Sequence, residues 1–241
     1  MITCFCPPSR VVLRRDCFFV SHFWESSNHP DPEGKYLRLH QNELRSQPWS
    51  YIWVDWSCMP QAPRSNKELK YFNRSLQTMS GIIRNSAFIQ FYPPFKPRLW
   101  ILYEVTEFTL TCHGKIEPTP DIAPFLRHVS EMISTSVQAT LEKYNYECSS
   151  LDDRAILTSW LELLVLLHQQ RIDIIDLRRI MDHLTWQSSC EVYYMIGSLK
   201  IAKFDGILTV NGSEYRFSPF PRLVSVSIYA ANKKEIADIS C

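Results

Sequence analysis

Three short apolar runs in the first half of the chain predict buried β-strands, at residues 17–21, 50–56 and 87–92. Each run is apolar almost without a break, which is typical of strands covered on both faces of a sheet. Each then stops abruptly at polar, aromatic or proline-rich sequence. These stops place polar side chains at the carboxyl end of every predicted strand.

Helical spacing separates the three runs. Residues 36–44 carry a weak helical pattern, and a stronger one predicts a helix capped by Ser65 or Asn66, with Glu68 in its first turn. The apolar positions of this second helix are Leu69, Phe72, Leu76, Met79 and Ile83. The order strand, helix, strand, helix, strand predicts an α/β fold with a parallel sheet and flanking helices.

The segment at residues 98–112 carries two patterns. Its first part, which contains Glu104, favours a helix, whereas residues 105–111 alternate between apolar and polar and favour a strand. Residues 113–120 are rich in turn-forming side chains and predict a linker.

The second half of the chain is mainly helical, with one long amphipathic helix over 122–141 and further helices over 151–168 and 173–184. Asn211-Gly212 between two apolar runs then predicts a β-hairpin within 199–217. We therefore expect an α/β domain over 1–115 and a helical extension with a C-terminal hairpin over 116–241. Whether the two pack as one unit stays open at this level.

Composition narrows the class of protein. The chain has 241 residues and a net charge of +1, which argues against a general nucleic-acid binder. Its eight cysteines form no C-x-x-C pair, and no apolar run approaches the roughly 20 residues that cross a bilayer. We expect a reduced, cytoplasmic protein that binds neither nucleic acid nor membrane.

Two sequence blocks show a resemblance to a known family. Residues 20–24 (Val-Ser-His-Phe-Trp) and 51–61 (Tyr-Ile-Trp-Val-Asp-Trp-Ser-Cys-Met-Pro-Gln) resemble the opening and the Y-x-W-I-D-x-x-C-I-D-Q block of fungal heterokaryon incompatibility (HET) domains. HET domains are similar to TIR domains, and residues 98–105 look like the TIR block R-W-C-L-x-E-L. His22, Glu25, Pro60 and Ile101 depart from these patterns, so the chain resembles a divergent member over residues 16–110.

The resemblance implies a TIR-like (flavodoxin-like) sheet and an enzyme that cleaves NAD at its nicotinamide–ribose bond, with NAD as substrate and no cofactor. It implies Glu104 as the catalytic acid, facing a ribose carbon that becomes positively charged. Arg98 is a candidate for the diphosphate, and Asp55 for a hydroxyl. The residues expected to bind substrate are Ser21, His22, Trp24, Asp55, Trp56, Cys58, Arg98 and Trp100. Many TIR sites are completed across subunits, so a homo-oligomer in immune or cell-death signalling is expected.

Other interpretations stay open. The chain fits a non-enzymatic TIR-like adaptor that self-associates, or an enzyme acting on another N-glycosidic bond, such as that of a nucleoside. Trp53 is expected in the core, Cys58 is more often a small buried hydrophobe, and Asp55 is commonly a turn or cap residue. His22 and His29 lack a third metal ligand at useful spacing. If the site is real, Ser21, Asp55 and Glu104 must face one cleft.

Overall fold

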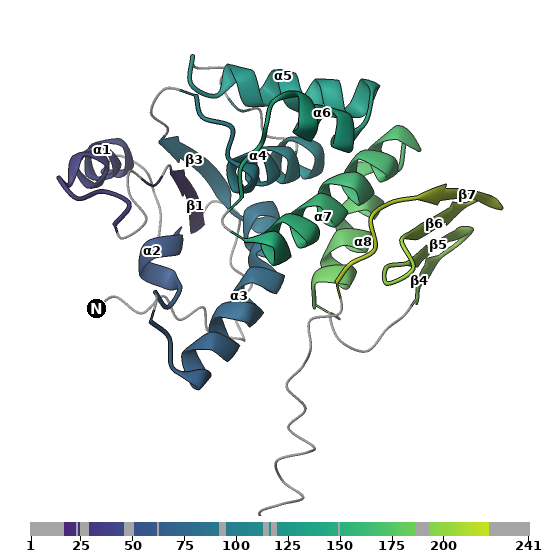
Figure 1. The fold of residues 1–241 in the computed structure, drawn as a ribbon, viewed down its shortest axis with the longest axis horizontal. Helices are drawn as coiled ribbons and strands as arrows, with labels where there is room; N and C mark the ends of the chain where they lie inside the picture. The colour runs from purple at the N-terminus through teal and green to yellow at the C-terminus, as the bar shows by residue number, and fades with distance from the viewer. Residues whose placement is uncertain are drawn as a thin grey trace, which may run out of the picture.

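The computed structural model describes residues 17–22, 24, 29–45, 51–61, 63–91, 95–112, 116, 120–148, 150–186 and 193–221. Within them the fold is mixed α/β, with eight helices, a parallel sheet and an antiparallel sheet (Figure 1). The first elements are β1 (Cys17–His22), α1 (Lys35–Leu44), β2 (Tyr51–Val54), α2 (Asp55–Cys58), α3 (Asn66–Asn85), β3 (Ala87–Phe91) and α4 (Leu99–Thr111). The remaining elements are α5 (Ala123–Ser134), α6 (Val137–Lys143), α7 (Leu151–Gln169), α8 (Ile174–Trp186), β4 (Tyr193–Ile196), β5 (Leu199–Ala202), β6 (Ile207–Val210) and β7 (Ser213–Arg216).

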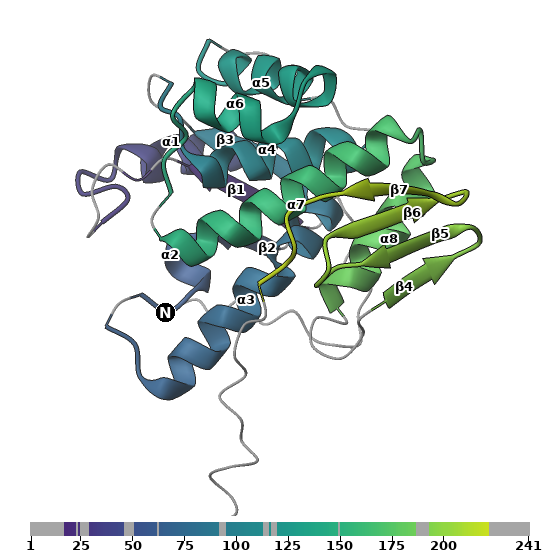
Figure 2. The same ribbon diagram turned by 45° about the vertical axis from the view of Figure 1, so that its right-hand side comes forward.

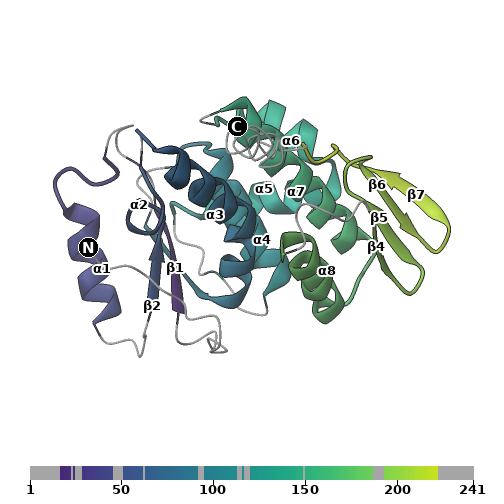
Figure 3. The same ribbon diagram turned by 90° about the horizontal axis from the view of Figure 1, so that it is seen from below.

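The predicted parallel sheet is confirmed, with strand order β2-β1-β3. Strand β1 is central, with β2 on one side and β3 on the other. The connection from β1 to β2 and the connection from β2 to β3 therefore run in opposite directions across the sheet. Right-handed crossovers then put α1 and α3 on opposite faces. Figure 3 shows α1 on one face and α3 with α4 on the other. Phe19 stacks on Trp53 with ring centroids 4.8 Å apart, so Trp53 is a core residue as predicted.

The second strand is shorter than its apolar run predicts. It ends at Val54, and Asp55 begins the short helix α2, so Asp55 and Trp56 lie in a helical turn rather than in the strand. Asp55 accepts a hydrogen bond from the backbone N–H of Trp56 through Oδ1 at 2.6 Å. Asp55 is the first residue of α2, and its carboxylate lies at the positive end of the helix, where it accepts from a backbone N–H that has no intrahelical partner.

Helix α3 begins with the predicted cap. The Ser65 hydroxyl accepts from the Glu68 N–H, and the Glu68 carboxylate accepts from the Ser65 N–H, which completes a capping box. Leu69 shares the apolar face of this helix, but its side chain is 45% exposed. Of the five apolar positions of this helix, only the last two, Met79 and Ile83, are buried, since the first turns of α3 extend past the body of the molecule (Figure 1).

Within residues 98–112, Leu99–Thr111 form one helix, α4, so the strand preference of residues 105–111 is wrong. Almost every side chain of α4 is buried. Alternation of apolar and polar residues indicates a strand only when one face is exposed to solvent, and that condition does not hold here. The hydroxyls of Thr106 and Thr111 each donate to a carbonyl four residues earlier, at 2.7 and 2.6 Å. These two threonines are thus satisfied without reaching water, whereas the buried hydroxyl of Thr109 has no hydrogen-bond partner among the described residues.

The long helix expected over 122–141 is also wrong, because it breaks into α5 and α6. Ser136 caps α6 by accepting from the N–H of Ala139 at 3.1 Å. Serine and threonine compete with helical hydrogen bonding, so the Ser134-Thr135-Ser136 run favours a restart over a continuous helix. Helices α7 and α8 agree with their predicted ranges, and α7 packs along α4.

The predicted hairpin forms with Asn211-Gly212 at its turn, and both of these residues have positive φ. Two further strands extend it to the antiparallel sheet β4-β5-β6-β7, which lies beyond α8 at the end farthest from α1 (Figure 2). Leu199, Ile201 and Leu208 from this sheet join the same buried cluster as Phe19 and Leu102. One hydrophobic core is therefore shared by the segments on both sides of residue 115, the expected boundary between the two parts of the chain.

Among the glycines of this sheet, Gly206 has the least room for a side chain. We expect Gly206→Ala to cost about 2–3 kcal/mol of unfolding free energy. Its φ is +66°, and an added Cβ would lie 2.1 Å from the backbone oxygen of Phe217. Gly197→Ala is the matched control, because Gly197 also has positive φ but nothing within 4 Å, so about 1 kcal/mol is expected. Urea unfolding measures both, and equal losses would contradict the steric explanation.

No helix within the described ranges has the length and apolar character needed to cross a bilayer.

Candidate functional site

Ser21 and Glu104 meet at the carboxyl end of the parallel sheet. Ser21 is buried near the end of β1, and its hydroxyl donates to Oε2 of Glu104 on α4. The two residues are 83 positions apart in the chain. Helix α4 therefore delivers the acid to the sheet edge at which the sequence places polar residues.

Asp55 reaches the same edge from the neighbouring strand. In the parallel register Val54 pairs with Val20, so Asp55 follows β2 at the level of Ser21. Its Oδ2 accepts from the indole Nε1 of Trp24 at 2.7 Å, and its Oδ1 accepts from the Trp56 N–H. Both carboxylate oxygens thus accept an N–H bond, which holds the Asp55 side chain at this sheet edge, where its charge acts on Glu104.

The environment of Glu104 keeps its carboxyl group neutral. Part of the side chain is exposed, but the carboxyl group lies among protein atoms, and this burial raises its pKa from 4.5 to about 8. The Ser21 hydrogen bond lowers the pKa, whereas the charge of Asp55 raises it. Glu104 forms no ion pair with any of the described side chains. At neutral pH Glu104 therefore holds its proton beside the ionised Asp55.

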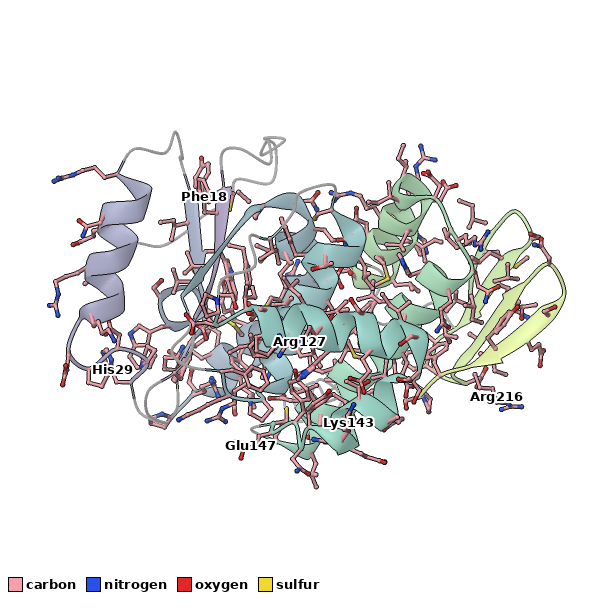
Figure 4. All side chains as sticks on the ribbon, turned by 90° about the horizontal axis from the view of Figure 1, so that it is seen from above. Phe18, His29, Arg127, Lys143, Glu147 and Arg216 are labelled. Carbon is pink, nitrogen blue, oxygen red and sulfur yellow. The ribbon has the colours of Figure 1, made fainter. Side chains whose placement is uncertain are left out.

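Aromatic rings surround Asp55. Trp24 and Trp56 pack edge to face with ring centroids 5.2 Å apart, and the His29 ring lies 4.8 Å from Trp56. Figure 4 labels His29 below α1, on the side of the molecule that carries the parallel sheet. Trp24 is fixed by its bond to Asp55, so its ring orientation is set before any ligand arrives.

Two of the residues expected to bind substrate have their contacts elsewhere. The indole N–H of Trp100 donates to Asp153 of α7 at 3.3 Å, although Trp100 lies one turn before Glu104. Arg98 pairs with Glu147 at 3.7 Å, and both side chains are largely exposed. The structure thus groups Arg98 and Trp100 with residues 147–153.

The last two expected residues add little. Cys58 is half-buried against the core, and its thiol lies 3.9 Å from the carbonyl of Ile52. This agrees with the interpretation of Cys58 as a small packing residue. The backbone of His22 belongs to β1, whereas its side chain lies outside the described residues.

Sequence reasoning missed Gln61 and His29 as parts of this region. The Gln61 amide donates to the carbonyls of Met59 at 3.0 Å, Asp55 at 3.3 Å and Trp56 at 3.4 Å, so it holds the turn that carries Asp55. Its place in the Cys58–Gln61 block was the available signal. His29 sits in a turn-rich loop and carries no periodic signal, so only the fold brings it to Trp56.

No group of three His, Cys, Asp or Glu side chains converges within the described part of the chain. The arrangement offers instead a neutral acid, an ionised acid, a hydroxyl and fixed aromatic rings. Comparison of the chain with protein-family models, with curated proteins and with solved structures finds no match.

Proposed function

We propose that this protein cleaves the N-glycosidic bond of NAD between nicotinamide and ribose, using Glu104, in a TIR/HET-like α/β fold. The observation that carries the proposal is the meeting of Glu104 with Ser21 and the charge of Asp55 at one sheet edge. The resemblance of residues 16–110 to TIR and HET sequences supports the choice of substrate.

The strand order adds support. The order β2-β1-β3 equals the start of the flavodoxin-like order, in which ligands bind outside the carboxyl ends of the strands where the direction of strand addition reverses. Ser21 lies at that reversal, since β1 is flanked by β2 and β3 and Ser21 pairs with Gln90. We expect a ligand bound there to lie beside Ser21, Asp55 and Glu104.

The chemistry suits a single acid. When the bond between ribose C1′ and the pyridinium nitrogen breaks, its electron pair leaves with nicotinamide and positive charge develops on the ribose. An ionised Glu104 stabilises that charge, and a water then adds to C1′ and loses a proton. The cationic nicotinamide ring itself favours the ionised form of Glu104, so substrate binding is expected to displace the proton.

The resting proton on Glu104 favours a second candidate, cleavage of a nucleoside with a neutral base. A neutral base leaves poorly unless its nitrogen is protonated, and an acid with a pKa of about 8 can supply that proton at neutral pH. The proton moves from Glu104 to the departing base, and the water that attacks C1′ returns one to Glu104.

The pH dependence of kcat/KM separates the two candidates. For NAD, kcat/KM is expected to rise about tenfold per pH unit below about pH 8 and then level off, because the free enzyme must lose the Glu104 proton. For a nucleoside, kcat/KM is expected to fall above about pH 8, because the acid is lost. Chromatographic measurement of released nicotinamide or free base over this range checks both.

Protein concentration is a second variable in this experiment, since the resemblance implies a homo-oligomer. We expect the rate of nicotinamide or base release to increase with the fraction of the protein that is in the oligomer. Assembled protein that releases no base from NAD or nucleosides at any pH would contradict both enzymatic candidates and favour the self-associating adaptor.

A further inference from the structure

Helix α4 has no fully exposed side, since only Trp100, Glu104 and Thr109 are half-buried and its other side chains are buried. Its buried residues occur on every side of the helix: Leu99, Ile101, Leu102, Tyr103, Val105, Thr106, Glu107, Phe108, Leu110 and Thr111. Burial of apolar surface is non-directional, so a helix that is buried on nearly every side gains nearly the same apolar burial after a small rotation or slide. Directional polar contacts must therefore fix the rotation of α4.

The strongest of these contacts is the fully buried guanidinium of Arg84. Its Nη1 donates to Oε1 of Glu107 on α4 at 2.6 Å, and both side chains have 0% exposure. On the other side, Nε donates to Asp182 at 2.9 Å and Nη2 donates to Thr185 at 2.8 Å, both on α8. One cation at the end of α3 thus ties α4 to α8.

Arg178 of α8 holds the ends of the same two helices. Its guanidinium donates to the carbonyls of Arg84 and Thr111, each at 2.9 Å, which are the last turns of α3 and α4. At the opposite end of α4, the Leu99 N–H donates to the carbonyl of Glu147 at 2.9 Å. These three anchors all come from outside α4, and two of them depend on α8.

Glu104 lies three residues before Glu107. In an α-helix this separation corresponds to about 4.5 Å along the axis and about 60° around it. A rotation of α4 that frees Glu107 from Arg84 therefore also moves the Glu104 carboxyl group relative to Ser21, its hydrogen-bond partner.

We infer that Arg84, held by α8, is a positioning residue that sets Glu104 against Ser21 through the buried contact of Arg84 with Glu107. The helical second half of the chain thereby has a specific role, because α8 fixes the orientation of the helix that carries the candidate catalytic acid. The placement of Glu104 stands on these contacts, and its effect on the reaction rests on the proposed function.

The test replaces the buried ion pair by apolar side chains in Arg84→Met/Glu107→Leu, because such replacements usually keep a protein folded. Carboxyl ¹³C NMR of the full chain follows the titration of Glu104, assigned by its absence in Glu104→Gln. We expect the apparent pKa of Glu104 to move by about one unit or more, since its burial and its distance from Asp55 change. Arg179→Met on the exposed face of α8 is the matched control and should leave the titration unchanged.

A second variant covers a failure of the double variant to fold. Asp182→Asn removes the α8 charge from Arg84 at a side chain with 35% exposure and leaves Glu107 intact. A smaller movement of the Glu104 titration in the same direction is expected. An unchanged Glu104 titration in the folded variants would overturn the inference, because apolar packing alone would then place α4.

Activity separates this inference from the proposed function. If the wild type releases nicotinamide, a misplaced acid is expected to lower kcat about 100-fold in the double variant. If the wild type releases none while the Glu104 titration still moves, the positioning role stands and the proposed function fails. A folded double variant with wild-type kcat would overturn the positioning role.

Discussion

Glu104→Gln is expected to lower nicotinamide release from NAD about 100- to 1000-fold, the size of loss seen when a group that stabilises transition-state charge is removed. Glutamine keeps the shape of the side chain and its place beside Ser21 but can neither ionise nor transfer a proton. The loss should therefore fall on kcat rather than on protein folding. Nicotinamide release at saturating NAD measures it.

The same substitution should stabilise the protein at alkaline pH. Because the pKa of Glu104 is about 8 in the folded state and 4.5 is its ordinary value, the folded state keeps a proton that the unfolded state has lost. In the wild type, the stability tied to this proton is fully present below about pH 4.5 and is lost as pH rises through about 8. We expect Glu104→Gln to exceed the wild type by about 2 kcal/mol at about pH 9, a value reduced for partial solvent contact.

Urea unfolding at about pH 5 and about pH 9 checks this sign, and the two proteins should be nearly equal at the lower pH. Glu142→Gln, at an exposed position on α6, is the matched control and should show no such gain. A Glu104→Gln protein that is less stable at both pH values, or that retains full activity, would contradict the description of this residue as a buried neutral acid with a catalytic role.

Arg84→Met is expected to cost about 3–5 kcal/mol of unfolding free energy, the largest stability effect among these variants. The substitution leaves Glu107 buried without its cation, and it also removes the donors that Asp182 and Thr185 accept from. An uncompensated buried carboxylate must either stay charged at high cost or take up a proton. Denaturant unfolding at neutral pH gives the loss.

Adding Glu107→Leu to Arg84→Met should restore most of that stability, because no buried charge then lacks a partner on α4. Such recovery would show that the pair specifies the arrangement of α3, α4 and α8 more than it stabilises the fold. Recovery of stability without recovery of the Glu104 titration is the combination that the positioning role requires. If Arg84→Met alone unfolds at the wild-type urea concentration, the buried network has no energetic weight.

Much of the local structure follows from short-range patterns. Ser65 and Glu68 sit at the spacing of a capping box, and the helix begins where they predict it. Asn211-Gly212 supplies the two positive φ angles of a tight hairpin, and the hairpin forms there. These signals work because capping and turn geometry involve residues only two or three positions apart.

Hydrophobic periodicity gives the wrong prediction where the packing of whole elements, rather than the alternation of residues, decides which side chains are buried. Residues 105–111 alternate as a strand does but form a helix, because α4 is buried on every side and alternation then carries no information. Leu69 has the spacing of a core residue, yet α3 begins beyond the layer that could cover it. Periodicity reports which residues share a face, whereas only the fold decides whether that face is covered.

The candidate site divides in the same way. Polar residues at the strand ends are visible in the sequence, and parallel strands bring their carboxyl ends to one edge, so Ser21 and Asp55 could be predicted to lie close together. Three sets of contacts could not be predicted from the sequence. They are the hydrogen bond from Ser21 to Glu104 across 83 residues, the bond from Trp24 to Asp55, and the separate contacts of Arg98 and Trp100. Such contacts depend on how whole elements pack.

By itself the sequence determined the three strands of the parallel sheet, the hairpin at Asn211-Gly212, most of the helices and the polar groups available at the sheet edge, since these depend on neighbouring residues. Only the tertiary structure decided that Glu104 is a neutral acid and Glu107, one turn away, is paired with a buried cation. Two glutamates on the same helix differ because burial and the nearest charge, both products of packing, set the free energy of ionisation.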